Sequence, residues 1–280
     1  MEQIQWYPGH MAKTRRLIEE NLKLVDIVVE LLDARAPLSS KNADIDGLLS
    51  AKPRLTALNK ADLADPESTR AWLLYFGRGA VSLDSLKGGG TAEITAMARS
   101  LTKEKTEREK GRGRLNVKIR AMILGIPNVG KSTLINKYAG SAKAKAENRP
   151  GVTRTKQWVK IGAGFELLDI PGILPPKFDD PSAGVRLALI GSIKDDILDI
   201  YALSLELIDI LRRAAPDALP ARYKITDGGE DSAVLLEKIA KGRGFVKKGG
   251  APDAERAAAA LIDEFRSGRL GRITLEPPPG

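Results

Sequence analysis

A glycine-rich octapeptide, GIPNVGKS, occupies Gly125–Ser132 near the middle of this 280-residue chain. Its spacing is G-x-x-x-x-G-K-[ST], the pattern of a loop whose backbone N–H groups cradle phosphate. An apolar run at Asn116–Leu124 predicts a buried strand before it, and Ser132–Gly140 after it has helical spacing closed by a glycine. Lys131 would reach the β and γ phosphates, and the Ser132 hydroxyl would bind Mg²⁺. The predicted phosphate-loop residues are Pro127, Asn128, Val129, Gly130, Lys131, Ser132 and Thr133.

A second motif, Asn59-Lys60-Ala61-Asp62, lies earlier in the chain and fits the pattern N-K-x-D. Asp62 can accept hydrogen bonds from N1–H and the exocyclic amine of guanine, and a base without these donors leaves buried polar groups unpaired. Lys60 would pack its stem along the base, and Asn59 would brace the loop. The same residues could form a surface turn leading into a helix. The apolar run Arg54–Leu58 before them favours the carboxyl end of a parallel strand, where nucleotide sites form.

Three further segments complete the set expected for GTP. Ser85-Leu86-Lys87 follows the apolar stretch Ala80–Leu83 and fits a serine-x-lysine segment that contacts the guanine carbonyl. In Asp169-Ile170-Pro171-Gly172, Asp169 can hold a magnesium-bound water, and the Gly172 amide can meet the γ-phosphate. Thr153 is placed to be the switch threonine that completes the magnesium shell.

These motifs stand in a rotated order. In the usual order the base-binding segments come last, whereas here they precede the phosphate loop, so we predict a circularly permuted GTPase domain. Alternating strands and helices predict an α/β fold with a doubly wound, mostly parallel sheet and the nucleotide at the strand carboxyl ends. After Pro171 the apolar spacing becomes helical, which predicts a smaller all-α C-terminal domain. Other expected elements are helices at Met11–Asn21, Pro66–Phe76 and Thr91–Leu101, a strand at Asp26–Leu32, and a strand pair at Lys156–Ile161 and Phe165–Ile170.

The chain as a whole resembles the YlqF/RbgA family of circularly permuted GTPases, which assist assembly of the large ribosomal subunit. The segments that carry the resemblance are WYPGHMAKTRR (Trp6–Arg16), LLDARAPLSSKN (Leu31–Asn42), LNKADL, GIPNVGKSTLIN, RPGVTRTKQWVK, DIPGI and FRSGRLGRITLE (Phe265–Glu276). The resemblance implies hydrolysis of GTP to GDP and phosphate, a GTPase domain at 1–175, and a helical RNA- or ribosome-binding domain at 176–280. It also implies the large ribosomal subunit and its rRNA as partners.

Two functions of other classes stay open. One is a self-contained RNA-modifying or phosphoryl-transfer enzyme, and the other is a GTP-gated RNA-binding scaffold that scarcely hydrolyses GTP. The chain has no cysteine and one histidine, and no acidic pair with clear spacing is evident, which weighs against the first.

The charge distribution favours a polyanionic partner. Residues 1–175 carry 29 basic and 19 acidic side chains, whereas residues 176–280 carry 16 and 17. Within the C-terminal part, Lys238–Arg272 is basic, and Gly242–Lys248 is a glycine-containing turn with one aromatic residue, suited to phosphate contact. The candidate RNA contacts are Lys247, Lys248, Arg269 and Arg272.

Two compositional features bear on location and linkage. No apolar run approaches the ~20 residues that a membrane span needs, and the N-terminus lacks a signal pattern, so we expect a cytoplasmic protein without a membrane partner. Lys103–Arg114 (KEKTEREKGRGR) is charged and free of apolar residues. We expect it to be a linker with few core contacts that joins the termini of an unpermuted relative.

One catalytic part is missing from the motifs. The water-orienting glutamine of Ras-like proteins directly follows the D-x-x-G glycine, and here that position is Ile173. His10, in a turn beside Trp6 and Tyr7, is a candidate replacement, although a lone histidine is often structural. Asn128 raises another possibility, because in GTPases with asparagine here potassium can bridge it to the phosphates; a loop-stabilising asparagine is the alternative.

Overall fold

The computed structural model describes residues 8–114, 117–140, 157–161, 164–170, 172 and 180–279. Its described strands form a six-stranded sheet in the order β3-β2-β1-β4-β6-β5. Their bounds are β1 Ile27–Asp33, β2 Arg54–Asn59, β3 Ala80–Ser82, β4 Ile119–Gly125, β5 Gln157–Ile161 and β6 Phe165–Asp169. All neighbours pair in parallel except β5 and β6, which are antiparallel. The predicted doubly wound, mostly parallel sheet is confirmed.

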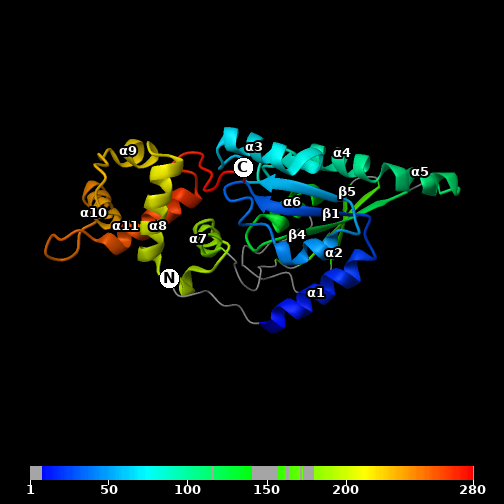
Figure 1. Ribbon diagram of the computed structural model, residues 1–280, viewed down its shortest axis with the longest axis horizontal. Helices are drawn as coiled ribbons and strands as arrows, with labels where there is room; N and C mark the ends of the chain where they lie inside the picture. Colours follow the sequence, from blue (N-terminus) through cyan, green and yellow to red (C-terminus); the bar gives the residue numbers. More distant parts are fainter. Residues whose placement is uncertain are drawn as a thin grey trace.

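Helices cover both faces of this sheet (Figure 1). Their bounds are α1 Pro8–Leu22, α2 Asp46–Leu49, α3 Pro66–Phe76, α4 Thr91–Leu101, α5 Lys103–Gly111 and α6 Lys131–Ala139. Side chains of α4 and α6 pack with alternate residues of the strands in one apolar cluster. Side chains of α1, α2 and α3 pack with the opposite set of strand residues, such as Val28 and Leu32. The inner strands β1, β2, β4 and β6 are mostly buried from both sides, as their continuous apolar runs require.

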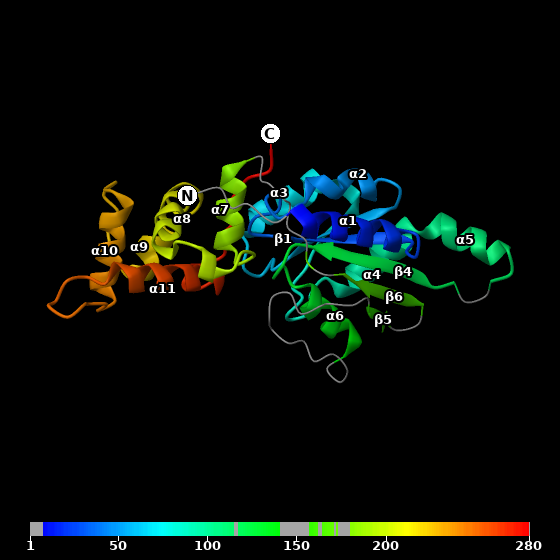
Figure 2. The same ribbon diagram turned by 90° about the horizontal axis from the view of Figure 1, so that it is seen from below.

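The C-terminal part is helical and lies beside the sheet domain (Figure 2). Its helices are α7 Pro181–Leu189, α8 Ile200–Ala214, α9 Ala218–Tyr223, α10 Ser232–Gly242 and α11 Ala254–Arg266. The packing face of α8 carries the buried Leu203, Leu207 and Leu211, in keeping with the helical apolar spacing predicted after Pro171. Glu264 of α11 holds the group together by bonds to Arg222, Tyr223 and Arg243.

The segment expected to be a linker is a helix. Lys103–Gly111 forms α5, which continues from α4 after Thr102. Lysine, glutamate and arginine are good helix formers, and Lys103 and Glu107 form an ion pair one turn apart. Lys105 pairs with Asp26, at the start of β1, and Glu109 is buried. No residue of α5 belongs to the apolar clusters of the described residues, so the expectation of few core contacts is confirmed.

The end of the chain returns to the first domain (Figure 1). After α11, residues 272–276 run alongside the loops that follow β1 and β2, and Ile273, Thr274, Leu275 and Glu276 are buried there. We call residues 272–276 the strap. Within the described parts of the chain, no helix combines the length and the apolar character needed to cross a bilayer.

Candidate nucleotide-binding site

Asn59 joins the two nucleotide motifs. It ends β2, while the phosphate loop follows β4, and both strands flank β1, so their carboxyl ends lie at one edge of the sheet. The Asn59 side chain is fully buried, and its Nδ2 donates to the Val129 carbonyl oxygen at 2.6 Å. Its Oδ1 accepts from the Ser85 N–H at 3.0 Å. Three segments that are distant in sequence therefore meet at this residue.

The phosphate loop has the backbone that its glycines permit. Gly130 has φ 103°, and a Cβ there would lie 2.2 Å from Asn59 Nδ2, so a larger residue would break the junction between the motifs. The loop leads into α6, whose amino terminus begins at Lys131 and favours an anion. Thr133 lies in the first turn of this helix.

Lys131 is buried in the loop. Its Nζ donates to the carbonyl oxygens of Gly125 at 2.9 Å and Ile126 at 2.8 Å. Burial lowers the pKa of Lys131 to about 8, although the negative charge of Asp169 acts in the opposite direction. The ammonium group is thus held inside the loop, where nucleotide phosphates would bring it negative charge.

The D-x-x-G segment lies against the phosphate loop. Asp169 ends β6 and is buried, close enough for its charge to act on Lys131. A Cβ on Gly172 would lie 2.9 Å from Lys131 Nζ and 2.9 Å from the Pro127 nitrogen, which places the Gly172 backbone beside the loop. Of the other predicted magnesium ligands, Ser132 follows Lys131 in α6, and Thr153 lies outside the described residues.

The serine-x-lysine segment is held by an acidic residue that no sequence motif identified. Ser85 is buried against Asn59, whereas the Leu86 side chain is exposed. Asp84 Oδ1 accepts from the N–H groups of Leu86 at 3.1 Å and Lys87 at 3.0 Å. Because the Leu86 N–H would be the donor to the guanine carbonyl, Asp84 would have to share or release it when a base binds.

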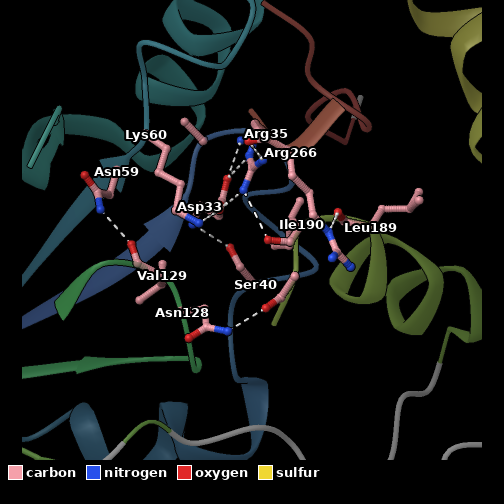
Figure 3. Close-up of polar contacts among 12 residues, drawn as sticks. Asp33, Arg35, Ser40, Asn59, Lys60, Asn128, Val129, Leu189, Ile190 and Arg266 are labelled. Carbon is pink, nitrogen blue, oxygen red and sulfur yellow. Dashed lines mark hydrogen bonds and ion pairs between the residues drawn. The ribbon is translucent and has the colours of Figure 1, made fainter. Parts of the chain in front are cut away.

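Lys60 is tied to a buried carboxylate. Its Nζ lies 2.9 Å from Asp33 Oδ2, and the same carboxylate accepts from Arg35 Nε at 2.9 Å and Arg35 Nη2 at 2.8 Å. Figure 3 shows the three side chains converging from the ends of β1 and β2. Burial alone would raise the pKa of Asp33, but the charges of Arg35 and Lys60 hold it well below its usual range. Burial also lowers the pKa of Lys60, against the attraction of Asp33.

Arg35 connects this network to the helical part by hydrogen bonds. Its Nη2 donates to the Ile190 carbonyl oxygen at 3.3 Å and its Nη1 to that of Arg266 at 3.4 Å, and its guanidinium lies 5.7 Å from the ring centre of Phe265. In the phosphate loop, Asn128 Nδ2 donates to the Gly191 carbonyl oxygen at 2.7 Å (Figure 3). The phosphate loop therefore contacts the turn after α7 directly, and the N-K-x-D motif is linked to it through Lys60, Asp33 and Arg35.

Asp62 lines a cavity beside its own loop. The cavity measures about 430 Å³, and its wall includes Asp62, Ser82, Asp84, Glu93 and, from the strap, Arg272. Arg272 is thus at the base-binding loop, where its Nε donates to the Ala64 carbonyl oxygen at 2.9 Å and its Nη2 to that of Ala61 at 2.8 Å.

Three of the predicted RNA contacts lie in exposed turns of the helical part. Lys247 and Lys248 are exposed in the turn after α10, and Arg269 is exposed after α11. In the turn after α10, the Phe245 ring is covered by Arg256, whose guanidinium lies 4.4 Å from the ring centre. His10 belongs to α1, but its side chain lies outside the part of the structure that can be described.

Comparison with known proteins agrees with this geometry. Residues 120–218 match the family model described as 50S ribosome-binding GTPase. The chain is 47% identical to ribosome biogenesis GTPase A of Bacillus cereus, covering 98% of this chain and 94% of the relative. It is 31% identical to the Thermotoga maritima protein of the same name, covering 98% and 95%. The crystal structure of GNP-bound YlqF from T. maritima superposes with a TM-score of 0.66 at 29% identity, covering 95% of this chain and 98% of that one.

Replacing Asp33 tests the buried network. Asp33→Asn leaves Arg35 and Lys60 without their counter-charge, so we expect a loss of about 3–5 kcal/mol in the free energy of unfolding at neutral pH. A folded-state pKa below the unfolded value means that this stabilisation is present above the unfolded pKa of about 4 and is lost as the pH falls below it. The difference in the free energy of unfolding between wild type and variant should therefore become smaller at acid pH.

Urea unfolding at pH 7 and at pH values below 4 measures this difference. The exposed Asp196→Asn is the matched control and should change stability by about 0.5 kcal/mol or less. Equal effects of the two substitutions at pH 7 would show that the Asp33 network contributes nothing specific.

Proposed function

Since this chain belongs to the ribosome biogenesis GTPase A family, we propose that it is an assembly factor for the large ribosomal subunit whose GTP turnover is stimulated by the ribosomal particle. The observation that supports GTP as the nucleotide is the junction at Asn59, where the base-binding loop meets the phosphate loop. The chain is a GTPase, as its family is. Work on nascent ribosomal subunits in a bacterium would take place in the cytoplasm.

The proposed site divides between base and phosphates. Asn59, Lys60, Asp62 and the Ser85-Leu86-Lys87 segment would bind guanine, while Pro127–Thr133 and the Gly172 amide would bind the phosphates. Phosphoryl transfer depends on positioning and charge neutralisation, which the loop amides and the Lys131 ammonium would supply.

A magnesium ion fits beside Ser132. The donor set is of the oxygen type that Mg²⁺ prefers, with the Ser132 hydroxyl at the start of α6 and the buried Asp169 carboxylate ending the neighbouring β6. We propose that Ser132, Asp169 and Thr153 hold the ion directly or through water. When bound, it would neutralise charge on the β and γ phosphates.

Potassium is a second proposed ion, at Asn128. The contact with Gly191 uses the amide nitrogen of Asn128, whereas a cation would take the amide oxygen. The two interactions therefore use different atoms of one side chain.

We retain residues 1–175 and 176–280 as the GTPase and helical RNA- or ribosome-binding domains, with the strap as an arm of the second domain on the first. Loss of the γ-phosphate would act on Gly172, which shortly precedes α7 and its capping residue Asp180. The turn after α7 contacts Asn128 and Arg35, which supports a movement of the helical domain on hydrolysis.

Turnover with and without large ribosomal subunits tests the function. We expect slow hydrolysis of GTP by the free protein, stimulation by the subunit, and no comparable turnover of ATP. Asp62→Asn should lower the affinity for GTP and raise the relative affinity for xanthosine triphosphate, because one acceptor position becomes a donor. Equal affinity of the wild type for ATP and GTP would rule out the proposed guanine site, and a subunit that leaves turnover unchanged would favour the GTP-gated scaffold.

Salt dependence tests RNA as the partner. Lysine and arginine contacts to phosphate release counterions, so subunit binding should weaken steeply as salt rises. The double reversal Lys247→Glu/Lys248→Glu should weaken subunit binding and reduce the salt slope without changing GDP affinity. These exposed residues lie in the turn between α10 and α11, at the end of the helical part away from the sheet (Figure 1). Binding that is insensitive to salt would argue for a protein partner.

His10 is the proposed water-orienting group, with Asn128 and potassium as the other candidate. His10→Ala should lower subunit-stimulated, single-turnover hydrolysis by about 10²–10⁴-fold, the range of a positioned acid–base group, with GDP affinity retained. A loss that appears only as weaker subunit binding or lower thermal stability would assign His10 a structural role. Replacing potassium by sodium in the same assay separates the contribution of the ion.

A further inference from the structure

The strap forms hydrogen bonds with four residues of the turn that carries Asp62. Arg272 donates to the carbonyl oxygens of Ala61 and Ala64 at 2.8 and 2.9 Å. The Ile273 N–H donates to the Leu63 carbonyl oxygen at 3.0 Å. On the far side of the turn, the Asp65 N–H donates to Thr274 Oγ1 at 3.1 Å. Asp62 therefore lies between residues whose backbone groups are hydrogen-bonded to the strap.

The strap is itself firmly anchored. The Glu276 carboxylate accepts from the Ser39 N–H at 2.8 Å and from Ser39 Oγ at 2.6 Å, and it pairs with Arg186 at 3.1 Å. The Glu276 carbonyl oxygen accepts from Trp72 Nε1 at 3.1 Å, and the Leu275 N–H donates to the Arg35 carbonyl oxygen at 2.7 Å. These contacts are buried, so they hold the strap, and with it the backbone of Arg272, in one position.

The turn requires such support because of its backbone. Lys60 has φ 59°, a left-handed conformation that a non-glycine residue adopts only where its surroundings stabilise it. Its Nζ is fixed by Asp33, and the residues on either side of Asp62 are fixed by the strap. Asp62 can read guanine only if its carboxylate meets N1–H and the exocyclic amine together, which demands a defined backbone.

We propose that Arg272 is a positioning residue for guanine recognition: by clamping the carbonyl oxygens of Ala61 and Ala64, it holds the turn so that Asp62 faces the base. The proposal rests on the proposed guanine site at Asp62. It gives Arg272 a role different from RNA contact, since two of its donor nitrogens are directed to the turn. Asp62 and Arg272 also line the same cavity.

The test compares GDP with inosine diphosphate, which lacks the exocyclic amine that Asp62 would read. Both affinities are measured by calorimetry on the full chain. Arg272→Ala should lower the affinity for GDP about tenfold, equivalent to about 1.4 kcal/mol. It should lower the affinity for inosine diphosphate less, so the preference for GDP over inosine diphosphate falls. Arg272→Lys, which keeps the charge and can reach one carbonyl oxygen, should recover part of that preference. Arg213→Ala removes the same charge from an exposed position at the end of α8 and should change neither affinity.

The preference ratio separates positioning from folding. Thermal unfolding identifies the variants that remain folded, and Arg272→Lys decides the question if Arg272→Ala does not fold. An unchanged preference in a folded Arg272→Ala overturns the proposal, as does an unchanged preference in Arg272→Lys where Arg272→Ala does not fold. A loss confined to subunit binding, which Arg269→Ala would share if both arginines contact RNA, overturns it too. Failure of the guanine site itself has another signature, because wild type would then bind GDP and ADP alike.

Discussion

A buried carboxylate at the end of β1 organises this molecule. Asp33 is fully buried, and removing such a charge from water costs several kcal/mol unless partners compensate. Arg35 and Lys60 supply the compensation through three contacts of 2.8–2.9 Å. Each partner is thereby fixed in a second role, since Lys60 holds the base-binding turn and Arg35 reaches the helical part at Ile190 and Arg266. The geometry of the nucleotide site and the placement of the helices share this one charge cluster.

The rotated motif order explains why the nucleotide site and the helical part share contacts. Parallel strands gather their carboxyl ends at one edge, so β1, β2, β4 and β6 bring their loops together whatever their order in the chain. In this order the D-x-x-G segment comes last and leads directly into α7, while the base-binding turn comes early. The end of the chain then returns to that turn through the strap. The helical part therefore contacts the site near the phosphates, through Asn128, and near the base, through Arg272.

The sequence predicted the parts of the site that depend on local geometry. A phosphate loop needs glycines at fixed spacing, and a base-reading turn needs its residues at a strand end, so both can be recognised without the fold. Asp33 and Arg35 were visible only within a family-like segment, although a charged pair directly after a buried strand is a usable signal. The clamp by Arg272 joins residues 61 and 272, and no local pattern predicts that contact. The charge count made Arg272 a candidate RNA contact, which stays a prediction, but it does not show that the guanidinium bonds to Ala61 and Ala64.

Contacts that couple two parts of a protein act in both directions. If the strap stabilises the turn that binds guanine, then a bound guanine must stabilise the strap by the same free energy. A partner that engages the helical part and shifts the strap would therefore change nucleotide affinity, and nucleotide release would change affinity for that partner by an equal factor. The turn after α7 gives the phosphates a second route, through Asn128 and Gly191. Base and phosphate would thus be coupled to the helical domain through separate contacts, so that loss of the γ-phosphate would alter one of them while the guanine keeps the other in place.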